Sequence, residues 1–362
     1  MLSPELLADL RQLAEEQERA GWSEPGRGCE AAWALMARAG VLGWVIPERF
    51  GGSDLPAPEV MAGYEQLAAA NLCATFVLTQ FNAAAARIAE CDNEDLKARS
   101  LPGMAAGRTT ATVGISHLTT SRRHTGRPMV RAEPAFGTGW TGHRLTGTLP
   151  WCTNAGFADL ILVGAERPDG RQLLAVINGT DDPAVQDHAC PELLALSASR
   201  TAEVTLDGVD VPDTDLVAGP VEEVMRQGAG GTGSVGTSAL AVGHAAGSLR
   251  GLVAEAEKRP ELGETLEPLQ RERAKLSADI QTIAAASSPE ELPEGLNAQT
   301  VRARANSLCL RSAQAYLTAS KGAGFVAGHP AGRFVREAMF FQVWSCPAPV
   351  AAAALREFAC GL

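Results

Sequence analysis

The sequence has few aromatic residues, no excess of positive charge and no long apolar run. Aromatic side chains make up only 5% of the 362 residues, and 42 Asp and Glu outnumber 31 Lys and Arg, which gives a net charge of −11. Surfaces that bind nucleic acid or anionic membranes need clustered Lys and Arg, so this acidic balance argues against both partners. No uninterrupted apolar run approaches the roughly 18 residues of a membrane-spanning helix.

Signals for export and for metal binding are also missing. The N-terminal segment MLSPELLADLRQLAEEQERAGW is acidic and helix-like, without the basic start and apolar centre of a signal peptide. The eight cysteines include no CxxC pair, and none clusters with histidine at zinc-ligand spacing. We therefore expect a cytoplasmic protein with free thiols and no metal site.

What is present is a chain of globular composition, 46% hydrophobic and 20% charged, long enough for two or three domains. Apolar residues recur at helical spacing over 2–108, interrupted at Ile46–Gly52 by a proline and two glycines. A small β domain is predicted over 109–220, with antiparallel turns between strands at 110–115, 142–148, 160–163, 173–176 and 203–206. Helical periodicity returns over 221–362, and four candidate helices at 222–258, 264–287, 297–322 and 331–361 predict a four-helix bundle. The predicted fold class is therefore α+β and multidomain.

Four segments, in this order along the chain, resemble motifs of the acyl-CoA dehydrogenase family. They are GWVIPERFGG at 43–52, LPWCTNA at 149–155 followed by Ala158 and Asp159, SRTAEVTLDGVDVP at 199–212, and KGAGF at 321–325 with Pro330 and the Arg-Glu-Ala of 336–338. The resemblance implies the fold just described and an FAD cofactor. It also implies a homodimer or homotetramer built through the bundle, because an FAD contact comes from a second subunit in this family.

The resemblance assigns flavin contacts to particular residues. Trp151 and Thr153 match family residues that lie against the flavin ring; otherwise they are an ordinary core Trp and strand Thr. Arg259, Gly322 and Gly324 are expected at the FAD pyrophosphate, and Gln270 matches a cofactor-binding glutamine of the family by its spacing from Leu262. A guanidinium suits a pyrophosphate because it donates two hydrogen bonds and offsets charge. The alternatives are a solvated arginine at a helix end and glycines that cap helices.

One flavin-contacting loop departs from the family pattern. The family's TEPGAGSD stands here as SHLTTSRR at 116–123, so Ser116 keeps a hydroxyl while the glycines are lost. Arg122 and Arg123, with His124 nearby, add charge that either holds a phosphate or faces water. His117 is the histidine expected near the flavin ring, as a catalytic residue or as a surface or capping residue.

The general base expected of the family is also missing. Oxidising an acyl thioester requires a carboxylate that removes the α-proton while the flavin accepts a hydride. At the family's usual position the chain has Ser345, and at the alternative position, 230–237, it has no acid. Cys346 is either a reactive thiol or a buried inert one. The chain is thus expected to be a divergent member that lacks the usual catalytic glutamate.

Three functions remain open at this point. The first is an FAD-dependent oxidoreductase acting on CH–CH groups of an acyl thioester or a related small molecule, with a changed base or substrate. The second is a flavin-dependent monooxygenase on the same fold, for which Ser116, His117 and Ser345 are the available residues. The third is a catalytically silent subunit that forms a hetero-oligomer with a second dehydrogenase-like chain.

Overall fold

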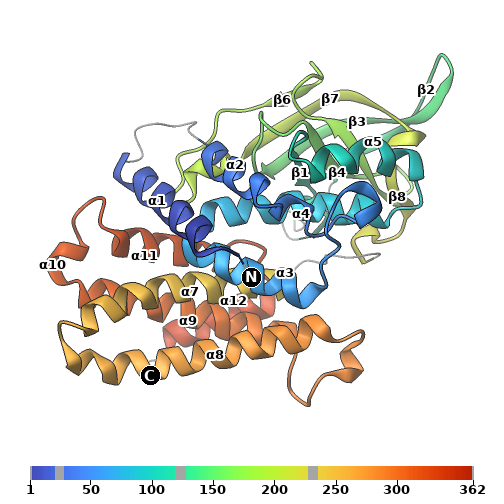
Figure 1. Ribbon diagram of the computed structural model, residues 1–362. Coiled ribbons are helices and arrows are strands. Elements are labelled where there is room, and N and C mark those ends of the chain that lie inside the picture. Colours follow the sequence, from blue (N-terminus) through green and yellow to red (C-terminus); the bar gives the residue numbers. More distant parts are fainter. Residues whose placement is uncertain (1, 21–27, 120–127, 227–234, 361–362) are drawn as a thin grey trace.

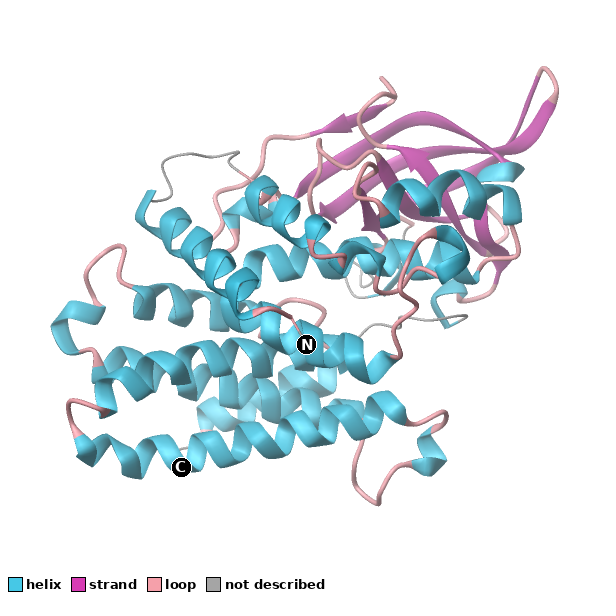
Figure 2. Cartoon of the chain, viewed as in Figure 1, coloured by secondary structure: helices cyan, strands magenta, loops and turns pink. Residues whose placement is uncertain are grey.

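The protein, described here from a computed structural model, has two helical regions and one β-sheet. The described residues are 2–20, 28–119, 128–226 and 235–360. Figure 1 shows the sheet at one end of the molecule, the C-terminal helices at the other, and the N-terminal helices between them. Figure 2 shows the same division, with the strands gathered in one place. The fold class expected from the sequence is confirmed.

The N-terminal region is helical, as predicted. Its elements are α1 (Pro4–Ala20), α2 (Glu30–Arg38), the 3-10 turns η1 (Val41–Gly43) and η2 (Glu48–Phe50), α3 (Ala57–Ala70), α4 (Leu72–Glu90) and α5 (Glu94–Ala105). The tight connection expected at 46–52 is present, with Gly51 at φ +85°. The alanine-rich stretch 64–89 is divided between α3 and α4 at Asn71, whose Oδ1 accepts from Ala74 N at 3.0 Å and caps α4.

Helix α4 is the one described helix that is long and apolar enough to cross a membrane by length and composition. Of its most apolar window, 72% is buried inside the protein. Its partners include α3, α5, α7 and β1. We therefore describe α4 as a core helix.

The sheet contains more strands than the sequence pattern predicted, and not all of its pairs are antiparallel. Its strands are β1 (Ala111–Gly114), β2 (Val130–Gly137), β3 (Trp140–Cys152), β4 (Leu160–Glu166), β5 (Gln172–Asn178), β6 (Val185–Asp187), β7 (Ala202–Pro212) and β8 (Leu216–Val221). Strand order is β6-β7-β3-β2-β4-β5-β8, with β1 paired to β4. The prediction that antiparallel turns alone join the strands was wrong, because β1 and β4 run parallel. Helix α6 (Ser116–Thr119) and β2 and β3 lie between them in the chain.

The C-terminal region consists mainly of long helices. They are α7 (Val235–Ala256), α8 (Gly263–Ala285), α9 (Ala298–Ala319), the short α10 (Lys321–Gly324), α11 (Pro330–Phe340) and α12 (Ala348–Ala359), with the 3-10 turn η7 (Pro260–Leu262) before α8. The single helix predicted over 331–361 was wrong. The segment forms two helices, because the chain turns over 341–347 and Pro347 is the N-cap residue of α12.

Two hydrophobic clusters hold the molecule together. One lies in the sheet and includes buried residues of β2, β3, β4, β5 and β7. The other contains both the N-terminal helices and the C-terminal helices, from Leu6 to Phe341. Within it, α7 carries glycines at every fourth position, Gly243, Gly247 and Gly251, where added Cβ atoms would lie within 3 Å of α3, α9 or α11. These glycines let α7 pack closely against its neighbours.

Candidate flavin site

The first group of candidate residues lies where β3 ends. Trp151 is the penultimate residue of β3 and is 52% exposed, whereas Thr153 just beyond the strand is buried. The Thr153 hydroxyl accepts a hydrogen bond from Thr201 Oγ1 at 3.2 Å, and Thr201 Oγ1 lies 2.8 Å from Ser199 Oγ. The end of β3 therefore presents an exposed indole beside a buried row of three hydroxyls.

The segment Leu196–Arg200 borders this group and contains the 3-10 turn η4 (Ser197–Ser199). Leu196 and Arg200 both have left-handed backbone conformations, with φ of +62° and +48°. Residues other than glycine keep a left-handed backbone conformation only where contacts with the surrounding structure hold them in it. The carbonyl oxygens of Ser199 and Arg200 accept from Asn154 N and Ala155 N, at 2.8 and 3.1 Å. The η4 segment, as we call residues 196–200, is thus bonded to the turn that follows Trp151 and Thr153.

Arg200 fixes a second aromatic ring near the end of β3. Its guanidinium lies 3.3 Å from the centroid of the Phe157 ring and also pairs with Glu30, which begins α2. Phe157 is 49% exposed. A cation over a ring face is attracted by the quadrupole of the ring. Trp151 in β3 and Phe157 in the turn after it are therefore both half-exposed aromatic side chains.

Ser116 and His117 lie on α6, directly after β1. The buried His117 donates from Nε2 to the carbonyl oxygen of Gly164 in β4 at 2.9 Å. Burial lowers the pKa of His117 to about 4, although that hydrogen bond acts in the opposite direction. His117 Nδ1 and Ser116 Oγ have no hydrogen-bond partner among the described residues. His117 is therefore neutral at pH 7 and is not a surface histidine, while Arg122, Arg123 and His124 lie outside the described residues.

Because the pKa of His117 is lower in the folded protein than in the unfolded chain, the free energy of unfolding depends on pH. Between pH 6.5 and about 4 the unfolded chain binds a proton at this position and the folded chain does not, so stability falls as pH falls through this range. From pH 8 to pH 5 wild type should lose about 2 kcal/mol more unfolding free energy than His117→Gln, which does not titrate. Urea denaturation of both proteins at the two pH values measures this difference. Equal losses of unfolding free energy in wild type and His117→Gln would contradict this prediction.

A second group of candidate residues lies at one end of the bundle. Arg259, between α7 and η7, donates from Nη2 to Glu255 at 2.7 Å and also to the carbonyl oxygen of Ala319, the last residue of α9. Gly322 and Gly324 lie on α10, which begins two residues later. A Cβ on Gly322 would meet nothing within 4 Å, whereas one on Gly324 would lie 2.7 Å from Ser320 Cβ. The backbone at Gly322 is thus open to an approaching ligand, and Gly324 is a packing position.

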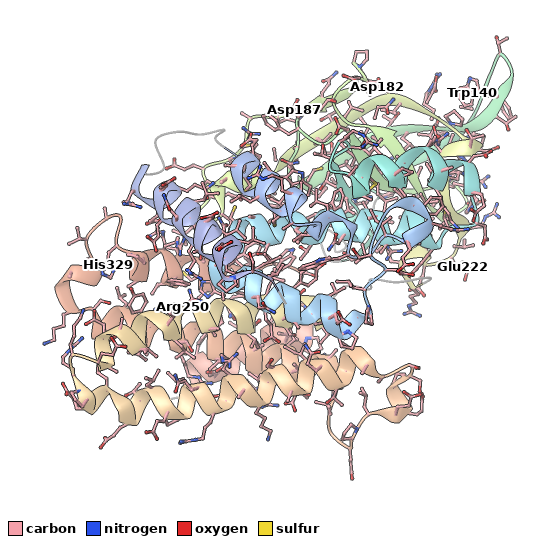
Figure 3. All side chains as sticks on the ribbon, in the orientation of Figure 1. Trp140, Asp182, Asp187, Glu222, Arg250 and His329 are labelled. Atoms are coloured by element: carbon pink, nitrogen blue, oxygen red, sulfur yellow. The ribbon has the colours of Figure 1, made fainter. Side chains whose placement is uncertain are left out.

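Gln270 lies on α8 at the rim of a shallow depression between α7 and α8. This depression has a volume of about 400 Å³ and is lined by Ala246, Leu249, Arg250, Val253, Gln270 and Arg273. Arg250, labelled in Figure 3, donates to the carbonyl oxygen of Ala69 in α3 at 3.3 Å. Sequence reasoning missed Arg250 and Arg273. The available signal for Arg250 was a single charged residue within the otherwise uncharged stretch 235–254 of α7.

Ser345 lies in the turn between α11 and α12, at φ +44°. The preceding Trp344 stacks on Phe340, with ring centroids 5.1 Å apart, and the fully buried Arg302 of α9 donates to Trp344 O at 3.0 Å. Burial raises the pKa of the neighbouring Cys346 thiol, although Arg302 opposes this. A protonated thiol is a poor nucleophile, so this raised pKa favours an inert thiol, although Cys346 is half-buried rather than fully buried.

The two groups of candidate residues do not meet within one chain. Figure 1 shows β3 in the sheet and α10 at the opposite end of the molecule. Within one chain, the candidate residues on β3 and α6 therefore lie apart from those around α7, α8 and α10. Among the described residues, no group of three or more His, Cys, Asp and Glu is placed to hold a metal ion.

Comparison with known proteins shows what this chain of helices, sheet and helices is similar to. The family described as acyl-CoA dehydrogenase, N-terminal domain, matches residues 5–108. The Bacillus subtilis protein named probable acyl-CoA dehydrogenase YngJ is 24% identical over 327 residues, covering 85% of this chain and 84% of its own.

Solved structures show the same fold over nearly the whole chain. Glutaryl-CoA dehydrogenase from Mycobacterium smegmatis, in complex with FADH2, aligns with a TM-score of 0.76 at 18% identity, covering 98% of this chain and 93% of its own. Dibenzothiophene monooxygenase from Paenibacillus sp. A11-2 aligns with a TM-score of 0.69 at 19% identity, covering 97% and 93%. The chain thus has the acyl-CoA dehydrogenase fold, and its residues 5–108 match the family model of the acyl-CoA dehydrogenase N-terminal domain.

Proposed function

We propose that the protein is an FAD-dependent oxidoreductase of the acyl-CoA dehydrogenase type, acting on an acyl thioester or a related small molecule. The observation that carries this proposal is Trp151, a half-exposed indole at the end of β3 with the Thr153 hydroxyl buried behind it. Large aromatic side chains on a protein surface offer a flat apolar area for a ring system. The flavin would supply the hydride chemistry, while Trp151 orients the ring and Thr153 and Thr201 offer it hydroxyls.

The cofactor would be shared between two chains. Arg259, Gly322 and Gln270 are remote from β3 in one chain, so they would serve the FAD diphosphate and adenosine of a partner. Arg250 and Arg273 add positive charge to the depression beside Gln270. Because Arg259 is already paired with Glu255, its contribution to a diphosphate requires that this ion pair be exchanged or extended. We therefore propose a homodimer or homotetramer, or a hetero-oligomer with a related subunit.

The second candidate function is a flavin-dependent monooxygenase, which needs no base for an α-proton. The observation that favours it is the neutral His117, with a pKa of about 4 and a buried Nδ1 that has no hydrogen-bond partner among the described residues, next to Ser116. An imidazole with so low a pKa is a weak base for a carbon acid. Ser345, in the position of the usual glutamate, has no carboxylate to remove that proton. These residues suit hydrogen bonding near a ring better than α-proton abstraction.

Flavin binding is the first property to measure. We expect purified protein, alone or titrated with FAD, to show flavin absorbance, and we expect Trp151→Ala to bind FAD about tenfold more weakly or worse. The matched control is Trp140→Ala, at the tip of the β2–β3 hairpin, which should bind FAD as wild type does. A colourless wild type whose stability and absorbance do not respond to FAD would overturn the proposal, as would equal affinities in the two variants.

Activity assays then separate the candidates. Bleaching of the bound flavin by acyl-CoA substrates under anaerobic conditions supports the oxidoreductase. Oxygen incorporation into a substrate when reduced flavin is supplied supports the monooxygenase. Flavin binding without either reaction, together with co-purification of an active dehydrogenase chain, supports the silent subunit.

A further inference from the structure

Two cysteine thiols from distant parts of the sequence lie against each other between α2 and α4. Cys29 immediately precedes α2, and Cys73 lies in the first turn of α4. Their sulfur atoms are 3.6 Å apart, and the two residues are only 8% and 6% exposed. A disulfide requires about 2.05 Å between the sulfurs, so an approach of about 1.5 Å would join them.

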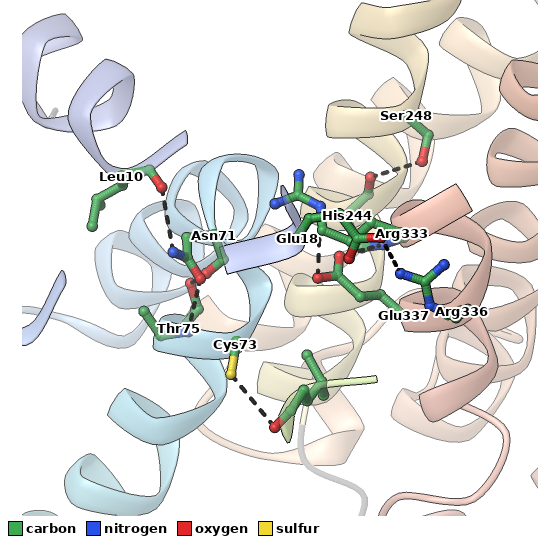
Figure 4. Close-up of polar contacts among 12 residues, drawn as sticks. Leu10, Glu18, Asn71, Cys73, Thr75, His244, Ser248, Arg333, Arg336 and Glu337 are labelled. Atoms are coloured by element: carbon green, nitrogen blue, oxygen red, sulfur yellow. Dashed lines mark hydrogen bonds and ion pairs between the residues drawn. The ribbon is translucent and has the colours of Figure 1, made fainter. Parts of the chain in front are cut away.

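Both thiols also contact the η4 segment. Cys29 Sγ lies 3.4 Å from the carbonyl oxygen of Ala198, and Cys73 Sγ donates to the carbonyl oxygen of Leu196 at 3.7 Å, the contact drawn in Figure 4. The same segment accepts hydrogen bonds from Asn154 N and Ala155 N. One short segment therefore connects the cysteine pair to the turn that follows Trp151 and Thr153.

We propose that Cys29 and Cys73 are a redox-modification site, at which reversible disulfide formation releases the η4 segment and loosens the turn beside Trp151. A disulfide removes both S–H donors, so the contacts to Ala198 O and Leu196 O are lost together. The two left-handed residues of the segment, Leu196 and Arg200, then lack part of the support that holds them in that conformation. The influence on flavin binding rests on the proposed function, but the disulfide itself does not.

The oxidant we name is hydrogen peroxide. The hydrogen bond with Cys29 and burial raise the pKa of the Cys73 thiol, so the Cys29 sulfur is the one that attacks, as its thiolate. It attacks a peroxide oxygen, the O–O bond breaks, and the products are a sulfenic acid and, after protonation, one water. The second sulfur then attacks the sulfenic sulfur, forming the S–S bond and releasing the second water as its own proton is lost. Two electrons leave the sulfur pair and reduce one peroxide to two waters. Any thiol reductant reverses the step by exchange.

Peptide mapping tests the bond directly and requires no flavin. The folded full-length protein is treated with peroxide, remaining thiols are alkylated in denaturant, and the protein is digested with trypsin. Cleavage at Arg and Lys places Cys29 in peptide 28–38 and Cys73 in peptide 50–87, each without a second cysteine. We expect these two peptides to be cross-linked, with a mass two hydrogens below their sum, and to separate on reduction. Alkylation of both cysteines after peroxide treatment would overturn the proposal.

Matched variants and hydrogen exchange test whether the disulfide releases the η4 segment and loosens the turn beside Trp151. Cys73→Ser should abolish the cross-link, whereas Cys91→Ser, at the other end of α4, should leave it intact. In the oxidised protein the amides of Asn154 and Ala155 should exchange several-fold faster than in the reduced protein, and Cys73→Ser should remove this difference. A cross-link without faster exchange would overturn the proposed release of the segment. Because neither measurement uses FAD, failure here and failure of flavin binding are distinguishable.

Discussion

Glu337→Ala is expected to lose about 3–5 kcal/mol of unfolding free energy, because it removes one charge from a buried network. Glu337 of α11 is 6% exposed, and its carboxylate lies 3.2 Å from His244 Nε2 and 3.9 Å from Arg333 Nε. Figure 4 shows these side chains pointing toward one another between α7 and α11. Burial alone would raise the pKa of Glu337, but Arg333 and His244 hold it below its ordinary value. The variant leaves the buried Arg333 guanidinium without this counter-charge and removes the carboxylate beside the His244 imidazole.

Urea denaturation measures this loss, and an exposed ion pair supplies the control. Glu267→Ala on α8 removes a carboxylate that lies 3.5 Å from Arg271, and both side chains are about 70% exposed. Such pairs contribute about 0–1 kcal/mol, so the control should unfold close to the wild-type midpoint. If Glu337→Ala unfolds at the same urea concentration as Glu267→Ala, the buried network does not stabilise the bundle as argued.

The second large effect is expected at the contact between α7 and α3. A Cβ on Gly243 would lie 2.3 Å from Glu65 O and 2.8 Å from Glu65 Cα, so a side chain there must separate the two backbones. Gly243→Val should therefore lose about 1–3 kcal/mol or more, the usual cost of forcing extra carbons into a packed core. Because α3 belongs to the N-terminal region and α7 to the C-terminal region, the substitution should destabilise both helical regions.

Gly263→Ala provides the comparison for that substitution. Gly263 begins α8, and a Cβ there would meet nothing within 4 Å. Alanine is the better helix former by about 1 kcal/mol in a helix interior, so this variant should be neutral or slightly more stable. Thermal unfolding of both variants checks the pair. A Gly243→Val protein as stable as Gly263→Ala would mean that α7 and α3 can separate without loss.

Much of the fold could be predicted from the sequence because its long helices have clear periodicity and clear ends. The division between helices, strands and helices followed from changes in that period. The strands β2, β6 and β8 were missed: β6 has three residues, whereas Pro134 in β2 and Gly219 and Pro220 in β8 break the strand pattern. The parallel pairing of β1 with β4 was missed because the short runs suggested only hairpins, and pairing depends on contacts across the whole sheet.

Candidate residues could be proposed from the sequence where a local motif contains them. Contacts between side chains of different segments could not be predicted in this way. Trp151 and Thr153 were found through a local motif, and their adjacent placement follows from their position at the end of one strand. The pairing of Arg259 with Glu255 was not predicted, although a glutamate four residues before an arginine is a sequence pattern that favours an ion pair at the end of a helix. The contact between Cys29 and Cys73 joins positions 44 residues apart and has no local sequence signal.

The shared cluster of N-terminal and C-terminal helices also bears on how the chain folds during synthesis. The face of α3 that includes the backbone at Glu65 and Ala69 is covered by α7, which begins at residue 235. The first helices therefore leave the ribosome well before the surface that buries them exists, whereas the strands from 111 to 221 can pair before α7 is made. The sheet is the part of the molecule able to form earliest, and the apolar faces of α3 and α4 remain exposed to chaperones and to aggregation until the glycine-lined side of α7 arrives.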